Sequence, residues 1–380
     1  MNTGIDRKRL VLLIAEYDYF LSHRLALAQE ATRAGYDVTV ITRVPPGAVP
    51  GAWPGIQVRH VAMARGTGNP IADLRALLQL VRLFREIRPA LVHNVSVKLI
   101  LLGSLAAWIA SVPRVLNAYT GLGTLFHTNS RRLYWLRCVL VPVLAFLIRR
   151  TGAWALFQNP EDQVSMLQLG LAAPDRSALV CGTGVDTDLF QATPESDGEP
   201  VVLFVGRLLR DKGIREFVSA AQALQTKGVV ARFVAAGDPD PENPQSISAA
   251  VLDVWRRTGP VEWLGQVADM PALLSRSHII CLPSYHEGAP KALLEAAASG
   301  RPVVATDIAG CRMVVQHGET GLLVPVRDAA ALGSALESLI CDPDLRRAMG
   351  AGARELALRR FAAHIINMHI MDLYRQMSQT

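Results

Sequence analysis

Short apolar segments alternate with longer amphipathic segments along nearly the whole chain, and this alternation constrains the fold more than any other feature. The pattern is typical of parallel strands joined by crossover helices. The first series of expected strands is Leu10–Ala15, Asp37–Thr42, Ala90–Asn94, Arg114–Ala118 and Trp154–Gln158, separated by expected helices at Leu21–Ala34, Ile71–Arg88 and Ile100–Ala110. A second series of expected strands is Val201–Gly206, Ala231–Ala236, Val261–Leu264, Ile279–Pro283, Pro302–Thr306 and Gly321–Val324, with helices expected to begin near Ile214, Ser246, Met270, Lys291 and Ala329.

Two such series predict two doubly wound α/β domains with a cleft between them. The 380 residues suffice for two domains of ordinary size, and a content of 50% hydrophobic and only 19% charged residues excludes intrinsic disorder. The expected division is an N-terminal domain over residues 1–187, a linker over the Pro-rich polar segment 188–200, and a C-terminal domain over 201–360. Residues 361–380 are expected to form a helix that closes the second domain or returns to the first.

Charge is distributed unevenly between the two halves. Residues 1–150 contain 19 basic and 7 acidic residues, whereas residues 151–380 contain 20 and 26, and no acidic residue lies between Glu86 and Glu161. A basic, acid-free stretch favours an anionic partner, either lipid headgroups or a phosphorylated substrate. Nucleic acid is the weaker alternative, because this stretch is rich in Leu, Val, Ala and Trp.

One segment of the first half is unusual for a plain Rossmann-like domain. Leu133–Ile148 is apolar apart from Arg137, and arginine pairs bracket it, namely Arg131, Arg132, Arg149 and Arg150. A helix of these 16 residues would span only about 24 Å, less than the roughly 30 Å hydrocarbon core of a bilayer. We therefore expect it to lie in the membrane interface, with burial between domains as the alternative.

The location and metal content follow from features near the N-terminus and from the cysteines. Only six apolar residues follow Arg7-Lys8-Arg9, too few for the core of a signal peptide. Five scattered cysteines predict reduced thiols, with neither disulfides nor a metal site. These features predict a cytoplasmic location, and the segment Leu133–Ile148 predicts peripheral association with a membrane.

The most specific chemical motif runs from Ser284 to Glu295. An expected strand leads into a loop with Glu287 and Gly288, and Pro290 then begins a helix that contains Glu295. The helix N-terminus offers free N–H groups to an anion, and carboxylates accept hydrogen bonds from hydroxyl groups. A ligand that combines phosphates with sugar hydroxyls satisfies both, whereas the alternative is a pair of solvated glutamates.

A second motif follows the first strand of the C-terminal domain, from Gly206 to Gly213. Arg207 and Lys212 lie where doubly wound sheets bind ligands, at the carboxyl end of a strand, and can clamp a diphosphate. Alone, such a pair would more often be a solvated turn.

These two motifs resemble the retaining glycosyltransferases of family 4, which have the GT-B fold, an α/β fold of two Rossmann-like domains facing each other across a cleft. Gly184–Phe190 and His317–Val324 resemble further motifs of that family. In the N-terminal half, Phe20–Arg24, Leu91–Lys98 and Arg114–Gly123 resemble a bacterial subgroup that acts on undecaprenyl-diphosphate-linked glycans. This subgroup implies a UDP-sugar donor, often an N-acetylhexosamine, and a polyprenyl-diphosphate-linked acceptor at the cytoplasmic face of the inner membrane.

The resemblance also implies residue roles. Arg207 and Lys212 would hold the donor diphosphate, Glu295 the ribose hydroxyls, and Glu287 the transferred sugar near the reacting carbon. The remaining donor-binding residues would be Gly206, Gly288, Ala289, Pro290, Lys291 and Leu294. No cofactor and no metal are implied, and we interpret Asp238-Pro-Asp240 and Asp342-Pro-Asp344 as loops that only imitate a metal-binding Asp-x-Asp motif.

The sequence departs from the family in its N-terminal half. Many members carry a His before Gly where this chain has Thr120-Gly121, and His23 is the candidate replacement, although a structural role is the commoner one for such a histidine. A sugar-nucleotide epimerase with the same fold, a transferase with a soluble or other lipid acceptor, and an inactive membrane scaffold are the alternatives to a lipid-linked glycan transferase.

Overall fold

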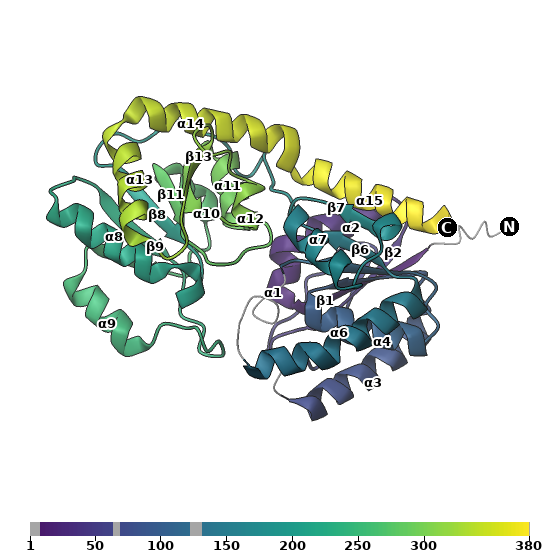
Figure 1. Cartoon of the computed structure of the whole chain (residues 1–380). Helices are drawn as coiled ribbons and strands as arrows, with labels where there is room; N and C mark the ends of the chain where they lie inside the picture. The colour runs from purple at the N-terminus through teal and green to yellow at the C-terminus, as the bar shows by residue number, and fades with distance from the viewer. Residues whose placement is uncertain (1–7, 64–68, 122–130, 380) are drawn as a thin grey trace. The chain divides into compact units, whose positions relative to one another are not determined.

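The computed structural model describes residues 8–63, 69–121 and 131–379, which form two compact units (Figure 1). Unit 1 comprises the chain up to Thr183 together with the segment from Asn367 onward, and unit 2 comprises Gly184–Ile366. The side chains of residues 131–133 also lie outside the description.

Unit 1 is built around a parallel sheet of order β3-β2-β1-β4-β5-β6-β7 in its described part. The strands are β1 Arg9–Glu16, β2 Asp37–Arg43, β3 Ile56–His60, β4 Leu91–Val95, β5 Val115–Tyr119, β6 Trp154–Phe157 and β7 Ser177–Leu179. The helical segments are α1 Tyr17–Tyr19, η1 Phe20–Arg24, α2 Leu25–Arg33, α3 Pro70–Ile87, α4 Val97–Ile109, α6 Arg131–Thr151, α7 Pro160–Gln168, η2 Pro174–Arg176 and, from Asn367 onward, α15 Ala363–Gln379. The inner strands β4 and β5 are buried along their whole length, as the apolar runs predict.

Unit 2 contains a second parallel sheet, of order β10-β9-β8-β11-β12-β13. Its strands are β8 Val201–Val205, β9 Arg232–Ala236, β10 Val261–Gly265, β11 Ile279–Leu282, β12 Val303–Thr306 and β13 Gly321–Val324. Its helical segments are η3 Arg210–Lys212, α8 Ile214–Thr226, α9 Ala249–Thr258, α10 Met270–Ser275, α11 Lys291–Ala298, α12 Ala309–Arg312, α13 Ala329–Cys341, α14 Pro343–Leu356 and η4 Ala357–Phe361. Strand order reverses beside β8, so the carboxyl ends of β8 and β11 mark the place where such sheets bind ligands.

The segment 188–200, which its composition indicates as a linker, is held against unit 2 by two buried arginines. The Arg346 guanidinium donates to both carboxylate oxygens of Glu195, at 2.8 and 2.9 Å. Arg301 donates to the Thr193 hydroxyl at 2.9 Å. The structure divides the chain before this segment, at Thr183 and Gly184. At Gly184, where φ is +74°, a Cβ would lie 2.7 Å from the Ala363 Cα, so this position requires glycine.

The last residues of α15 belong to unit 1, where Tyr374 is completely buried. Its hydroxyl lies 2.7 Å from Nδ1 of His93, in the middle of β4. Arg114 donates to the Ser378 carbonyl at 3.1 Å. Burial, with the nearby positive charge of Arg24 adding to it, lowers the pKa of His93 well below its usual value.

His93 makes the stability of unit 1 sensitive to acid. The folded state keeps this imidazole neutral, whereas the unfolded chain binds a proton as pH falls below about 6.5. The contribution of His93 is therefore complete above that pH and is lost below it, with a slope of up to about 1.4 kcal/mol per pH unit. We expect chemical unfolding measured at pH 7.5 and 5.5 to show a smaller loss of stability in His93→Gln than in wild type, and equal losses would contradict this assignment.

Candidate functional site

The two motifs of the C-terminal half meet at the carboxyl edge of the unit 2 sheet. Strands β8 and β11 are neighbours, with Val202 beside Ile279 and Phe204 beside Cys281. The loop that follows β8 and the loop that follows β11 therefore leave the sheet at the same edge. This pairing brings together two motifs that are about 80 residues apart in the sequence.

Lys212 and Glu287 form an ion pair between Nζ and Oε1, and both side chains are largely shielded, with 23% and 12% of their surfaces exposed. Gly213 makes this approach possible. Its φ is +73°, and a Cβ there would lie 2.1 Å from the carbonyl oxygen of Pro283. The backbone N–H of Tyr285 also donates to the Asp211 carbonyl at 2.8 Å, which fixes the two loops to each other.

Arg207 extends from the end of β8 and pairs with Asp240 at 2.7 Å. Another close backbone approach positions it, since a Cβ on Gly237 would lie 2.0 Å from the Gly206 carbonyl. Arg207 remains 58% exposed and accessible to a ligand. The sequence analysis interpreted Asp240 as part of a loop that only imitates a metal-binding motif. In the structure, Asp240 forms the ion pair with Arg207, a residue predicted to bind the diphosphate.

Glu295 lies in the second turn of α11 and is only 8% exposed. Lys291, one turn earlier, pairs with it at 2.8 Å. The loop ahead of α11 packs against Gly310 of α12, where a Cβ would lie 2.4 Å from the Glu287 carbonyl and 2.6 Å from that of Gly288. Pro290 is the N-cap and provides no side-chain cap. No side chain of the N-cap residue therefore competes with an anion for the first N–H groups of α11.

Neighbouring titratable groups remain protonated. Burial, aided by a 2.6 Å hydrogen bond to Glu216, raises the pKa of the Tyr285 hydroxyl to about 12. Burial also raises the pKa of the Cys311 thiol, and the negative charge of Glu287 adds to the increase. A neutral thiol is a poor nucleophile. Charge at this site is therefore carried by the carboxylates and by the cations that pair with them.

The predicted donor-site residues all lie in unit 2, on the loops after β8 and β11 and on α11. Gly206, Arg207 and Lys212 come from the loop after β8. Glu287, Gly288, Ala289 and Pro290 precede α11, while Lys291, Leu294 and Glu295 belong to it. Leu294 is buried and contributes packing.

The predicted residues of the N-terminal half lie in unit 1. His23 is part of η1, stacks on Tyr19 with ring centroids 4.1 Å apart, and lies 2.7 Å from the Ser22 hydroxyl through Nδ1. Thr120 and Gly121 follow β5, and the loop after them lies outside the described residues. Sequence reasoning gave His93 no role of its own, although it lies in the segment Leu91–Lys98, next to Asn94 in the otherwise apolar strand β4.

The segment Leu133–Ile148, predicted to lie in the membrane interface, belongs to helix α6, which has one buried side and one exposed side. Leu144, Leu147 and Ile148 are buried in the core of unit 1, whereas Trp135, Val139 and Phe146 are exposed. Arg149 and Arg150 are exposed, and Arg137 lies over the Tyr134 ring at 6.0 Å. The side chains of Arg131 and Arg132 fall outside the described residues. Within the described chain, no helix is long and apolar enough to cross a membrane.

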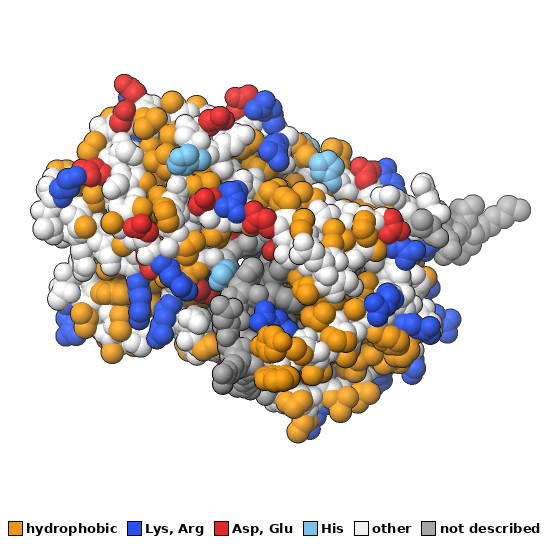
Figure 2. Space-filling view, viewed as in Figure 1, with side chains coloured by type: hydrophobic (Ala, Val, Ile, Leu, Met, Phe, Trp, Pro, Cys, Tyr) orange, Lys and Arg blue, Asp and Glu red, His pale blue; other side chains and the backbone are white. Residues whose placement is uncertain are grey.

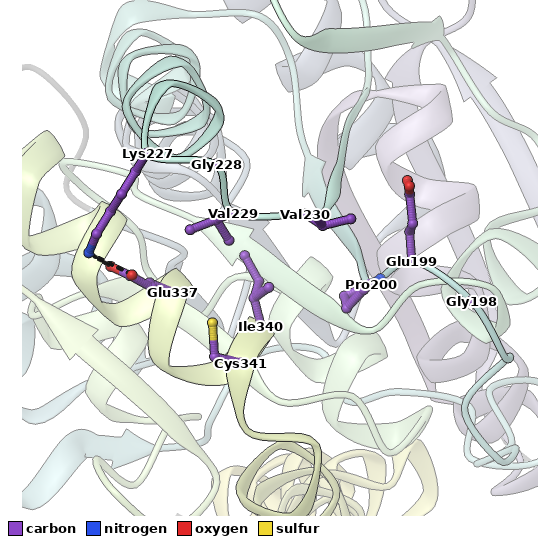
Figure 3. A pocket seen from close by; sticks show the side chains of 10 residues that line it. All are labelled: Gly198, Glu199, Pro200, Lys227, Gly228, Val229, Val230, Glu337, Ile340 and Cys341. Atoms are coloured by element: carbon purple, nitrogen blue, oxygen red, sulfur yellow. Dashed lines mark hydrogen bonds and ion pairs between the residues drawn. The ribbon is translucent and has the colours of Figure 1, made fainter.

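A pocket of about 660 Å³ lies elsewhere in unit 2 and is distinct from this site (Figure 3). It is lined by the residues just ahead of β8, the turn from Lys227 to Val230 ahead of β9, and the end of α13. These residues place the pocket at the amino edge of the sheet, opposite to the edge where doubly wound sheets bind ligands.

In the described residues, no group of three or more His, Cys, Asp or Glu side chains is arranged to hold a metal ion.

The two parallel sheets, with a charged site at a carboxyl edge, define a two-unit α/β protein of the doubly wound class. Comparison with known families gives two matches, "Glycosyl transferase 4-like" over residues 9–150 and "Glycosyl transferases group 1" over residues 199–342. Together they cover most of both units. The chain belongs to the family 4 glycosyltransferases, and it is a glycosyltransferase with the GT-B fold.

Individual relatives agree with this assignment. An N,N'-diacetylbacillosaminyl-diphospho-undecaprenol alpha-1,3-N-acetylgalactosaminyltransferase from Campylobacter jejuni is 27% identical over 84% of this chain and 86% of the relative. The capsular polysaccharide biosynthesis glycosyltransferase CapM of Staphylococcus aureus is 25% identical over 84% and 85%. A sucrose-phosphate synthase structure from Thermosynechococcus elongatus has a TM-score of 0.81 at 21% identity, covering 98% of this chain and all of that one. Anabaena HepE in complex with UDP has a TM-score of 0.75 at 20% identity, covering 97% and 100%.

Replacing Lys212 tests the electrostatic role of this site. We expect Lys212→Ala to lower kcat at least about a hundredfold, because a preorganised cation that stabilises a departing diphosphate acts mainly in the transition state. The free energy of unfolding should fall by about 1–3 kcal/mol, because Glu287 is left largely shielded without its cation. Lys227→Ala is the matched control, because Lys227 pairs with Glu337 at the amino edge. A folded Lys212→Ala protein with full activity would contradict the assignment.

Gly213→Ala tests the loop contact. The added Cβ would meet the Pro283 carbonyl, so we expect a loss of stability of about 2–4 kcal/mol or a displaced loop with impaired turnover. Gly228 has a similar φ of +81° but open space around its Cβ position, so Gly228→Ala should cost only about 1 kcal/mol of backbone strain. Equal unfolding midpoints and activities for the two variants would show that the close approach is unimportant.

Proposed function

We propose that this glycosyltransferase transfers a sugar, an N-acetylhexosamine, from a UDP-sugar to a polyprenyl-diphosphate-linked glycan, with retention of anomeric configuration. The product would serve the assembly of a surface polysaccharide or of a glycan for glycoproteins. The observation that carries the donor half is the ion pair of Lys212 with Glu287 at the carboxyl edge of one sheet, with Arg207 on the same loop as Lys212 and Glu295 on the helix that follows Glu287. The likeness to the Campylobacter transferase, whose name contains an undecaprenol-linked acceptor, supports the acceptor half.

The proposed roles follow from charge. Cleavage at the anomeric carbon leaves positive character on the sugar and negative charge on the nucleotide diphosphate. Arg207 and Lys212 would stabilise that growing negative charge, while Glu287 would accept hydrogen bonds from the transferred sugar and Glu295 from the ribose. Because a nucleotide diphosphate is already a good leaving group, no strong general acid is needed. The acceptor hydroxyl would attack from the same face, with its proton passing to the donor phosphate.

The proposed reaction requires neither a cofactor nor a metal ion, since cationic side chains are available for the diphosphate. The lipid-linked acceptor would place the enzyme at the cytoplasmic face of the inner membrane, as a peripheral protein. Thr120 and Gly121, which follow β5, and His23, in the helical segment η1 that comes after β1, are the proposed residues for the acceptor side.

A donor and acceptor panel tests this function. Purified protein is incubated with UDP-, GDP- and ADP-sugars, with and without a detergent-solubilised polyprenyl-diphosphate-linked glycan, and both nucleotide release and sugar on the lipid are measured. We expect release that requires a UDP-sugar and the lipid together, and that Lys212→Ala abolishes.

Other outcomes would overturn specific parts of the proposal. Conversion of the sugar nucleotide without any acceptor would instead identify an epimerase. Transfer to soluble glycans alone would refute the lipid-linked acceptor, and a requirement for GDP- or ADP-sugars would refute the UDP donor.

A further inference from the structure

The outward face of α6 has the wrong polarity for a helix that faces water. Its inner side already packs in the core of unit 1, yet its outer side is also apolar. Trp135 is 69% exposed, Val139 64% and Phe146 45%, and they recur at helical spacing along one stripe. An exposed stripe of this kind marks a surface that binds something apolar.

The neighbouring helices extend the same surface. α4 packs between α3 and α6 in one layer on the sheet (Figure 1). Trp108 at the end of α4 meets Phe146 edge to face, with ring centroids 5.7 Å apart. On α3, Ile71, Leu74 and Leu78 are each more than half exposed. Figure 2 shows hydrophobic side chains gathered over this layer.

We name this region the apolar helix surface. It consists of exposed residues on the three helices: Ile71, Leu74, Leu78, Trp108, Ile109, Tyr134, Trp135, Val139, Val143 and Phe146.

Positive charge accompanies this surface. The three helices contain nine Lys and Arg residues but only two acidic residues. Both acidic side chains have basic partners, Asp73 with Lys98 at 2.7 Å and Glu86 with Arg59 at 3.6 Å. Exposed arginines lie toward the C-terminal ends of the helices, namely Arg82, Arg85, Arg149 and Arg150.

We propose that the apolar helix surface docks on an anionic lipid bilayer, with its Trp, Tyr and aliphatic side chains entering the interface and its arginines contacting lipid phosphates. This inference deepens the proposed function by naming the part of the chain that reaches the membrane. Trp and Tyr favour the interface between headgroups and acyl chains, and arginines add electrostatic attraction to anionic lipids.

The position of the surface within unit 1 suits a lipid-linked substrate. α3 and α6 begin at the carboxyl edge of the sheet. The first turn of each helix has an exposed apolar residue, Ile71 in α3 and Tyr134 in α6. Thr120 and Gly121 lie at that same edge, at the end of β5. Docking would therefore bring the bilayer close to the edge of unit 1 where the proposed acceptor residues lie.

A second copy of the chain is a poorer partner for this surface. A two-fold symmetric contact places each patch against itself. The arginines of one copy would then face those of the other without acidic partners, and like charges across an interface oppose binding. An anionic bilayer complements both the apolar and the cationic parts.

The chain offers a matched pair of reporters, because Cys138 on α6 and Cys341 at the end of α13 are both exposed, while Cys181, Cys281 and Cys311 are buried. An environment-sensitive fluorophore is attached to Cys138 in Cys341→Ser and to Cys341 in Cys138→Ser. Each protein is mixed with vesicles of phosphatidylglycerol and phosphatidylethanolamine, or of phosphatidylcholine alone. We expect a blue shift only for the label at Cys138 and mainly with the anionic vesicles.

Substitutions then test affinity by vesicle co-sedimentation, without donor or acceptor. Trp135→Glu/Val139→Glu should weaken binding at least about tenfold, and Arg149→Gln/Arg150→Gln should weaken it about fivefold per arginine on anionic vesicles. Val254→Glu, at a half-exposed valine of α9 in unit 2, should leave binding unchanged.

Clear results would overturn the inference. Equal shifts for both labels, or unchanged vesicle binding in the folded Trp135→Glu/Val139→Glu protein, would refute the docking surface. A wild-type dimer that this double variant converts to monomer would assign the surface to a second copy. Since none of these measurements involves sugar transfer, docking can fail while the proposed function survives, and the reverse also holds.

Discussion

The contact between the β8 and β11 loops is the constraint on which the candidate site depends. Gly213 lets the backbone approach the Pro283 carbonyl, and this approach sets Lys212 against Glu287. A comparable close contact between Gly237 and Gly206 sets the position from which Arg207 extends. The site is therefore made by backbone packing at glycine positions, and each of its cations faces a carboxylate. A diphosphate that enters must compete with these carboxylates, which favours a ligand that also offers hydroxyl groups to them.

The two units divide the chemistry in the way that the charge distribution indicates. The acidic half of the sequence contains the site with paired cations and carboxylates, whereas the basic half contains the apolar helix surface and its arginines. The glycosyltransferase assignment accounts for the site with paired cations and carboxylates. The proposed docking on an anionic bilayer accounts for the apolar helix surface and its arginines. One enzyme thus combines a polar candidate donor site with a surface suited to the membrane that would hold its proposed acceptor.

Much of this architecture could be predicted because buried strands leave strong signals in a sequence. β4 and β5 are buried throughout, and their apolar runs predicted them. β3 and β7 were missed, since edge strands are short and partly exposed and therefore lack such runs. The segment 188–200 has the composition of a linker, but buried Arg301 and Arg346 fix it, and these long-range partners leave no local signal. The donor-site residues come from two motifs and a family resemblance, and their roles stay predictions, whereas Asp240 and His93 acquire their partners only through the fold.

A crystal structure of the chain with a bound UDP-sugar would test the central claim most directly. The account predicts the diphosphate within hydrogen-bond distance of Arg207 and Lys212, the ribose at Glu295 and the sugar at Glu287. A diphosphate bound instead at the amino edge, beside Lys227 in the pocket ahead of β8 and β9, would contradict it.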